Sequence, residues 1–197
     1  MGRKCLGLNR LEGKKSMAKK VDELVIRYLQ QQTRKERKIN IYDDLVKIGD
    51  RFYKFTEWNL LKGKFHIYLP TTFEIIFNKE KRMKVHKDMA DIIITDSGTS
   101  ALSLKIFENY EIVTIKNLMK ELLNKCEANV LIDESDETGD KIVKFIDYKI
   151  TAGFEDLYVF MFFSNLDENV VMGTFTCCFK DHEHWKEALL QIIKTIK

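Results

Sequence analysis

The sequence predicts an α+β fold in which a mainly antiparallel β-sheet packs between helices. Short runs in which apolar and polar residues alternate recur between residues 51 and 180, which is typical of strands. Apolar residues recur with a helical period at 18–37, 110–126 and 181–196. In Leu157–Phe163 both alternating faces are apolar, so this strand is predicted to lie at the centre of the sheet, covered on both sides.

One main domain is predicted, preceded by a basic arm. The 197 residues are 45% hydrophobic and 32% charged, which is enough to bury one core without disulfides or metals. Residues 1–17 are polar and without period, and we expect them to be a disordered extension. We expect 18–40 to form a basic amphipathic helical arm and 41–197 to form a single α+β domain.

The first half of the chain predicts a helix and a hairpin. The arm carries an apolar stripe for about two turns, made of Val21, Leu24, Val25, Tyr28 and Leu29. Residues 51–61 are aromatic-rich, a Lys-Gly turn follows, and 64–69 alternate strictly. Pro70 ends this second strand because it has no N–H for the ladder. Residues 71–90 are mixed and basic, and predict a short helix or loop.

The second half predicts another hairpin, a helix and an antiparallel meander. Residues 92–95 and 101–107 pair across the loop 96–99, whose small residues suit a turn. A helix follows, with an apolar face of Ile112, Ile115, Leu118, Met119, Leu122, Leu123 and Cys126. Four strands are then predicted: 128–132, 141–150, 157–164 and 170–180. The closing helix buries Trp185, Ala188, Leu189, Ile192, Ile193 and Ile196.

The cysteines and histidines near the end of the chain are predicted to be packing rather than a metal site. Strand alternation sends Cys177 and Cys178 to opposite faces, so the two thiols cannot easily share a metal. His182 and His184 are two apart at a helix start and point in different directions. Asp181 is placed as the N-cap of that helix.

Three other motifs fail on spacing. The acidic stretch 133–140 has glycine seventh, where an EF-hand loop needs it sixth, so it is predicted to be a solvated hairpin tip. Residues 13–16 lack the earlier glycine of a phosphate-binding loop, and 98–100 lack the G-x-S-x-G elbow of a nucleophile. No catalytic, cofactor-binding or metal-binding residue is therefore predicted.

Cysteine usage favours a reducing compartment, and we expect a cytoplasmic location. The four cysteines are adjacent at 177–178 and otherwise scattered, which is a poor layout for disulfides. The first sixteen residues hold no apolar run that could serve as a signal-peptide core. The longest apolar stretch is far below the roughly 20 residues of a membrane-spanning helix, so no membrane span is expected.

The basic arm contains the leading candidates for contact with nucleic acid. Residues 1–40 carry twelve Lys and Arg against four Asp and Glu, a net charge of +8, whereas the rest of the chain carries −5. The candidates are Arg34, Lys35, Arg37 and Lys38, because a basic arm on an acidic body can bind phosphate. They lack interleaved aromatic residues for stacking bases, so a solvated helix end is the favoured alternative.

Two segments carry a resemblance to a known superfamily. Lys64–Pro70 is a strand that ends in proline, and Gly173–Ile196 is a final strand, a short acidic turn, a tryptophan and a closing helix. With the order of elements between them, they resemble the PsbP/DcrB-like superfamily over about residues 52–197. The resemblance implies a helix–sheet–helix sandwich that serves as a non-catalytic assembly or interaction factor. None of the superfamily's site residues carries over.

The leading functional hypothesis is a non-catalytic cytoplasmic protein-interaction module that works by surface complementarity. An adaptor, a secretion-associated chaperone or an immunity-type protein would each fit, and each implies a protein partner. The alternative is a nucleic-acid-associated protein that binds through the basic arm. A small-molecule enzyme is the third hypothesis.

Overall fold

The computed structural model describes residues 39–78, 90–96, 100–126, 129–138, 141–152 and 155–197. All of them belong to one unit, Ile39–Lys197. The predicted extension 1–17 and nearly all of the predicted arm 18–40 lie outside the described residues, as does the phosphate-loop-like stretch 13–16.

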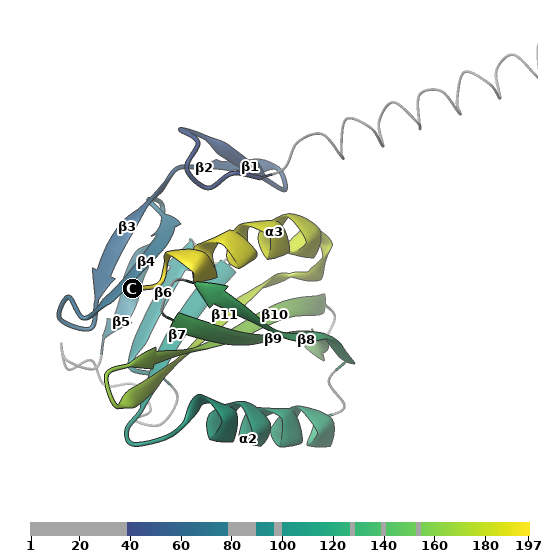
Figure 1. Cartoon of the computed structure of the whole chain (residues 1–197). Coiled ribbons are helices and arrows are strands. Elements are labelled where there is room, and N and C mark those ends of the chain that lie inside the picture. The colour runs from purple at the N-terminus through teal and green to yellow at the C-terminus, as the bar shows by residue number, and fades with distance from the viewer. Residues whose placement is uncertain (1–38, 79–89, 97–99, 127–128, 139–140, 153–154) are drawn as a thin grey trace, which may run out of the picture. The chain divides into compact units, whose positions relative to one another are not determined.

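An antiparallel sheet of seven strands forms the centre of the fold, in the order β5-β6-β7-β11-β10-β9-β8 (Figure 1). The strands are β5 (Glu74–Asn78), β6 (Ile92–Asp96), β7 (Ser100–Phe107), β8 (Asn129–Thr138), β9 (Lys141–Ala152), β10 (Glu155–Leu166) and β11 (Asn169–Cys178). The last four are consecutive neighbours, which confirms the predicted meander. The second predicted hairpin is confirmed as β6 and β7.

One helix covers each face of the sheet, and the predicted α+β class is confirmed (Figure 1). The helix α2 (Ile112–Lys125) lies on one face and α3 (His182–Ile192) on the other, with 3₁₀ turns η2 (Phe179–Asp181) before α3 and η3 (Ile193–Thr195) after it. The central strand β10 is buried on both sides, as predicted. Its even-numbered residues from Tyr158 to Phe162 pack in the core under α3, and its odd-numbered residues from Val159 to Phe163 pack in the core under α2.

Two hairpins complete the core on the α3 side. They are β1 (Val46–Ile48) with β2 (Arg51–Tyr53), and β3 (Phe55–Leu60) with β4 (Phe65–Pro70). The predicted faces of β4 are confirmed, since Phe65, Ile67 and Leu69 are buried. The turn before β4 contains Gly63, whose positive φ of 79° suits glycine. The predicted strand 51–61 is split, because residues 51–53 pair with β1 rather than with β4.

Four further predictions of local structure are wrong. Residues 74–78, predicted as part of a helix or loop, form the edge strand β5, since Ile75, Ile76 and Phe77 favour an extended backbone; the stretch 79–89 lies outside the described residues. The acidic stretch 133–140 was predicted to be a hairpin tip, but its residues up to Thr138 belong to a strand. Thr138 pairs with Lys141 of the next strand. The predicted buried face of α2 is narrower than expected, because Leu118 and Leu122 are exposed.

The fourth correction concerns the start of α3. Asp181 occupies the N-cap position, but its side chain makes no capping hydrogen bond. The carboxylate lies instead against the β1–β2 turn, where a Cβ added to Gly49 would be 2.9 Å from Asp181 Oδ1. Tertiary packing of the hairpin therefore replaces the predicted local cap.

Candidate interaction surface

The cysteines and histidines near the end of the chain are divided between β11 and the start of α3. Cys177 is buried and Cys178 lies on the opposite face. Burial, followed by the charges of Asp181 and Cys178, raises the pKa of the Cys177 thiol, which keeps it protonated and a weak nucleophile. The His182 ring stacks on Phe179 with centroids 4.2 Å apart, and His182 Nδ1 lies 2.8 Å from the Phe179 carbonyl oxygen. His182 is therefore held by packing and a local hydrogen bond.

A buried ionic group, missed in the sequence, joins α3 to the sheet. Asp147 on β9 is fully buried, and Tyr158 on β10 donates its hydroxyl to Asp147 Oδ2 at 2.8 Å. Lys186 on α3 places Nζ 2.7 Å from the same oxygen. Burial, and then the charge of Asp147, raises the pKa of Tyr158, so the phenol remains a donor. Asp147 lies two residues after the buried Phe145 on β9, so the two residues are on the same face of the strand. This spacing could have predicted from the sequence that Asp147 is buried.

A second buried carboxylate attaches the β1–β2 hairpin to the sheet. Asp96 is the last residue of β6, although the sequence placed it in a loop. Tyr53 donates its hydroxyl to Asp96 Oδ2 at 2.8 Å, and an Arg51 guanidinium nitrogen lies 3.3 Å from the same oxygen. Burial, and then the hydrogen bond to Asp96, raises the pKa of Tyr53 to about 12. The inner side of this hairpin is therefore anchored by a cation, a phenol and a carboxylate.

These buried groups attach one element to another, and the Cys177 thiol beside them is not activated. Cys177 lies opposite Tyr158 in the strand register, so the buried thiol and the buried phenol are neighbours, and both stay protonated. His184 is exposed. Within the described ranges, His, Cys, Asp and Glu side chains form no group of three that could hold a metal.

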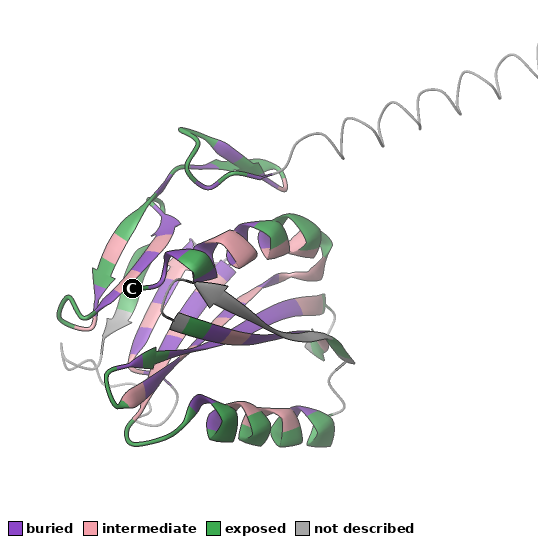
Figure 2. Ribbon diagram, in the orientation of Figure 1, coloured by how far each residue is buried: buried purple, intermediate pink, exposed green. Residues whose placement is uncertain are grey.

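The most exposed of the large apolar side chains in the described ranges lie in and just before the β1–β2 hairpin. Tyr42, Leu45 and Phe52 are 65%, 64% and 62% exposed, and we call these three residues the hairpin surface. Phe52 lies opposite Lys47, so alternation places Leu45, Lys47 and Phe52 on the outer face of the ribbon. Figure 2 shows exposed positions along this hairpin next to buried ones. Exposed apolar patches rimmed by polar residues mark interaction sites, so we take these three side chains as the candidate surface.

Charges of both signs surround the hairpin surface. Asp43 and Asp44 lie between Tyr42 and Leu45 and are exposed, as is Asp50, while the exposed bases Lys47, Arg51 and Lys54 lie near Phe52. Apolar side chains with a charged rim are typical of a protein–protein interface, in which Tyr and Phe are enriched at the centre. The aspartates beside Tyr42 and Leu45 are complementary to basic residues next to an apolar patch on a partner.

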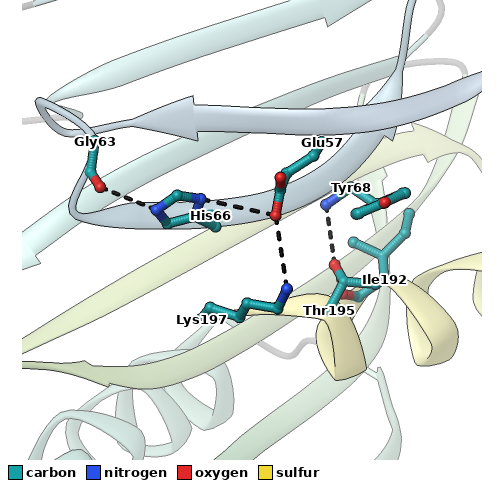
Figure 3. A network of polar contacts seen from close by, with 7 residues as sticks. All are labelled: Glu57, Gly63, His66, Tyr68, Ile192, Thr195 and Lys197. Carbon is teal, nitrogen blue, oxygen red and sulfur yellow. Dashed lines mark hydrogen bonds and ion pairs between the residues drawn. The ribbon is translucent and has the colours of Figure 1, made fainter.

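Tyr42 rests on a firmly held part of the molecule. Its ring contacts Tyr68 of β4 edge-on, with centroids 5.5 Å apart. The Tyr68 backbone N–H donates to Thr195 Oγ1 at 2.9 Å, and the Thr195 hydroxyl donates to the Ile192 carbonyl at 2.7 Å (Figure 3). Thr195 is buried, so this chain of hydrogen bonds ties β4 to the end of α3.

Backbone pairing beside this chain of hydrogen bonds adds to the attachment. His66 and Lys197 exchange two backbone hydrogen bonds of 3.2 Å. Glu57 Oε1 lies 3.7 Å from His66 Nδ1 and 3.8 Å from Lys197 Nζ, while His66 Nε2 lies 3.0 Å from the Gly63 carbonyl (Figure 3). The ion pairs are partly exposed and contribute little, so the backbone bonds carry the attachment.

The arrangement of helices and sheet is shared with a solved structure. The chain is similar to cyanobacterial PsbP (CyanoP) from Synechocystis sp. PCC 6803, with a TM-score of 0.57 and 10% identity over 76% of this chain and 95% of that one. The fold is PsbP-like. A protein of unknown function from Pseudomonas aeruginosa matches with a TM-score of 0.42 and 13% identity, over 72% of this chain and 94% of that one. No protein-family model and no curated protein sequence matches the chain.

The PsbP-like fold confirms the resemblance seen in the sequence, and at this identity it concerns the fold alone. The hairpin surface is accordingly argued from this chain's own residues. The predicted nucleic-acid contacts Arg34, Lys35, Arg37 and Lys38 lie outside the described residues. In the part of the chain that the structure describes, no helix is both long enough and apolar enough to cross a bilayer.

Proposed function

We propose that this PsbP-like protein is a non-catalytic, cytoplasmic protein-interaction module that binds its partner through the hairpin surface. An adaptor, a secretion-associated chaperone or an immunity-type protein would each work in this way. The observation that carries the proposal is the exposure of Tyr42, Leu45 and Phe52, each above 60%. Full burial of such a side chain against a partner stabilises the complex by roughly 1.5–3 kcal/mol before the costs of association.

The rigidity of the hairpin supports the proposal. Val46, Ile48 and Tyr53 on its inner face are buried, and Tyr53 is bonded to the buried Asp96. A ribbon fixed on one side loses little conformational freedom when its other side binds. The three exposed side chains are thus presented on a preorganised support.

The chemistry around the surface supports a particular kind of partner and location. The carboxylates of Asp43, Asp44 and Asp50 favour a partner with Lys or Arg around an apolar patch, and such charges speed association at low salt. The raised pKa of Cys177 argues against thiol catalysis. Cys126, Cys177 and Cys178 are free thiols, which fits a reducing compartment.

The test compares two triple variants of the full chain. The hairpin variant carries Tyr42→Ser, Leu45→Ser and Phe52→Ser. The control carries Val113→Ser, Leu118→Ser and Leu122→Ser, which change three exposed apolar residues of α2. Affinity purification from the native host with mass spectrometry identifies the partner, and titration calorimetry measures its Kd. Because exposed substitutions change stability by about 0.5 kcal/mol or less, both variants should stay folded.

The hairpin variant should bind its partner at least about 100-fold more weakly, since interface aromatics contribute about 1–2 kcal/mol or more each. The α2 control should bind like the wild type. Equal binding by the hairpin variant and the wild type would refute the proposed surface.

A nucleic-acid role is a second candidate, supported by the separation of charge between residues 1–40 and the rest of the chain. Binding to nucleic acid through Arg34, Lys35, Arg37 and Lys38 should weaken steeply with salt and disappear when residues 1–38 are deleted. An adaptor should keep its partner in moderate salt. A salt titration of the captured complex therefore separates the two functions.

A further inference from the structure

The strand β8 forms an open edge of the large sheet. Among the described residues, β8 pairs with β9 on one side and no strand pairs with its other side (Figure 1). After a bulge between Val130 and Ile132, seven consecutive residues up to Thr138 pair with β9 in unbroken register. Alternate residues of such an edge present their backbone N–H and C=O groups outward, which is a template for a further strand.

The other edge of the sheet is a poorer template. The strand β5 has five residues, and a bulge between Ile75 and Phe77 interrupts its register with β6. Bulges twist an edge and end regular pairing. An added strand therefore finds its longest regular backbone along β8.

The residues of β8 are acidic and apolar, without a base. Four of its ten residues are acids: Asp133, Glu134, Asp136 and Glu137. Apolar side chains are exposed at the same border of the sheet. Val130 and Leu131 of β8 are 37% and 41% exposed, and Ile142 of the neighbouring strand β9 is 48% exposed. The edge thus combines a regular backbone, apolar contact area and a charge of −4.

This combination selects among possible occupants. Like charges directly opposite each other destabilise paired strands, so two copies of β8 repel each other. A strand rich in Lys or Arg gains charge complementarity along the same edge. The charge therefore disfavours the pairing of two β8 edges and favours a basic strand from another protein.

We propose that β8 accepts an extended segment of a protein partner, in which Lys or Arg alternates with β-branched apolar residues. The segment adds to the sheet as its eighth strand through main-chain hydrogen bonds. Its basic side chains lie on one face of the added strand, along a β8 that carries four acids, and its apolar side chains lie on the other face, which is that of Val130 and Ile142. This inference adds a second surface to the proposed function and rests on it only in taking the ligand to be a protein.

The experiment uses three synthetic peptides and the full chain. Each peptide is about eight residues long, close to the usual length of a strand. The first alternates lysine with threonine and valine, the second replaces lysine by glutamate, and the third keeps the lysines but carries proline at two alternate apolar positions. Fluorescence anisotropy measures binding at low and moderate salt, and amide hydrogen exchange locates it.

The lysine peptide should bind, and the proline peptide should bind at least about tenfold more weakly because it lacks two backbone donors. The glutamate peptide should not bind. Exchange should slow at alternate amides of residues 132–138, because only the outward amides gain partners. The hairpin variant should bind the lysine peptide like the wild type, which keeps this test independent of the proposed hairpin surface.

A charge variant tests the role of the acids. Asp133→Asn, Glu134→Gln, Asp136→Asn and Glu137→Gln together should weaken binding of the lysine peptide about tenfold and remove most of its salt dependence. The matched control changes four exposed glutamates elsewhere to glutamine: Glu108, Glu121, Glu183 and Glu187. It should bind the lysine peptide nearly as well as the wild type.

Three results would overturn the proposal. They are equal binding of the proline and lysine peptides, protection that falls outside residues 129–138, and weakening by the matched control as large as that by the charge variant. Concentration-dependent oligomers of the wild type with protected β8 amides would assign the edge to a second copy instead. The peptide comparison on the wild type decides the matter even if the charge variant fails to fold.

Discussion

Gly173 on β11 is a sensitive position in the core, because a side chain there has no space. It lies opposite Phe162 on β10, whose ring covers it. A Cβ added to Gly173 would lie 2.7 Å from Phe162 Cε2 and closer still to Cε1 and Cζ. Carbon atoms pack best at about 3.5–4.0 Å, so the ring would have to move by about 1 Å or more. Phe162 is buried among other core residues, which leaves the ring little room to move.

We expect Gly173→Ala to lower the free energy of unfolding by about 3 kcal/mol, the upper end of the range for overpacked cores, since three ring atoms clash. For a chain of this size that corresponds to a melting temperature lower by about 6–12 °C. Urea denaturation and thermal melting followed by circular dichroism measure both. Phe162→Leu in the same background should recover part of the loss, because it removes the ring.

The matched control is Gly63→Asn, at a turn where no atom lies within 4 Å of an added Cβ. Asparagine tolerates the positive φ of this turn, so the control should cost less than about 1 kcal/mol. A Gly173→Ala protein as stable as the wild type would contradict the packing of β10 on β11. So would a double variant without recovery.

Three further predictions concern the core and its attachments. Trp185→Ala should cost about 3–5 kcal/mol in denaturation, since the ring is buried; unchanged stability with loss of the partner would place Trp185 in an interface. Lys186→Met should destabilise more than Asp147→Asn, because it leaves the fully buried carboxylate without its cation, and the double variant should recover stability in a double-mutant cycle. Burial raises the folded-state pKa of Tyr53 and Tyr148 from 10.0 to about 12. The stabilisation they provide is therefore full below pH 10 and lost as the pH rises towards 12, so an equal free energy of unfolding at pH 8 and 11 would contradict it.

Elements with strong local periodicity were predictable from the sequence. In Leu157–Phe163 and in the helix that contains Trp185, the spacing of the apolar residues shows which faces are buried. This spacing can be read from each segment alone. The strand β5 was missed because the basic residues after Asn78 dominate the window in which Ile75 lies. An edge strand this short gains its stability from pairing with β6, which local pattern does not contain.

The buried charges were not predictable because their partners are distant in the sequence. Asp96 meets Tyr53 across 43 positions, and Asp147 meets Lys186 on another element. From the local sequence, an isolated Asp near a turn is predicted to be exposed to solvent in a loop, and this was the prediction for Asp96. Likewise, Leu118 and Leu122 fit a helical stripe, but a helix laid on a flat sheet buries a narrower face than the stripe allows.

The hairpin surface follows from one of these unpredicted attachments. Alternation indicates the inner face of β1, where Val46 and Ile48 flank Lys47, but in β2 it leaves open whether Phe52 or Arg51 and Tyr53 turn inward. Asp96 decides it, because Arg51 and Tyr53 reach it from the inner side. Once they are bound there, Phe52 and its neighbours must point to solvent. The same buried carboxylate that holds the hairpin in place therefore exposes the apolar side chains by which we propose the protein binds its partner.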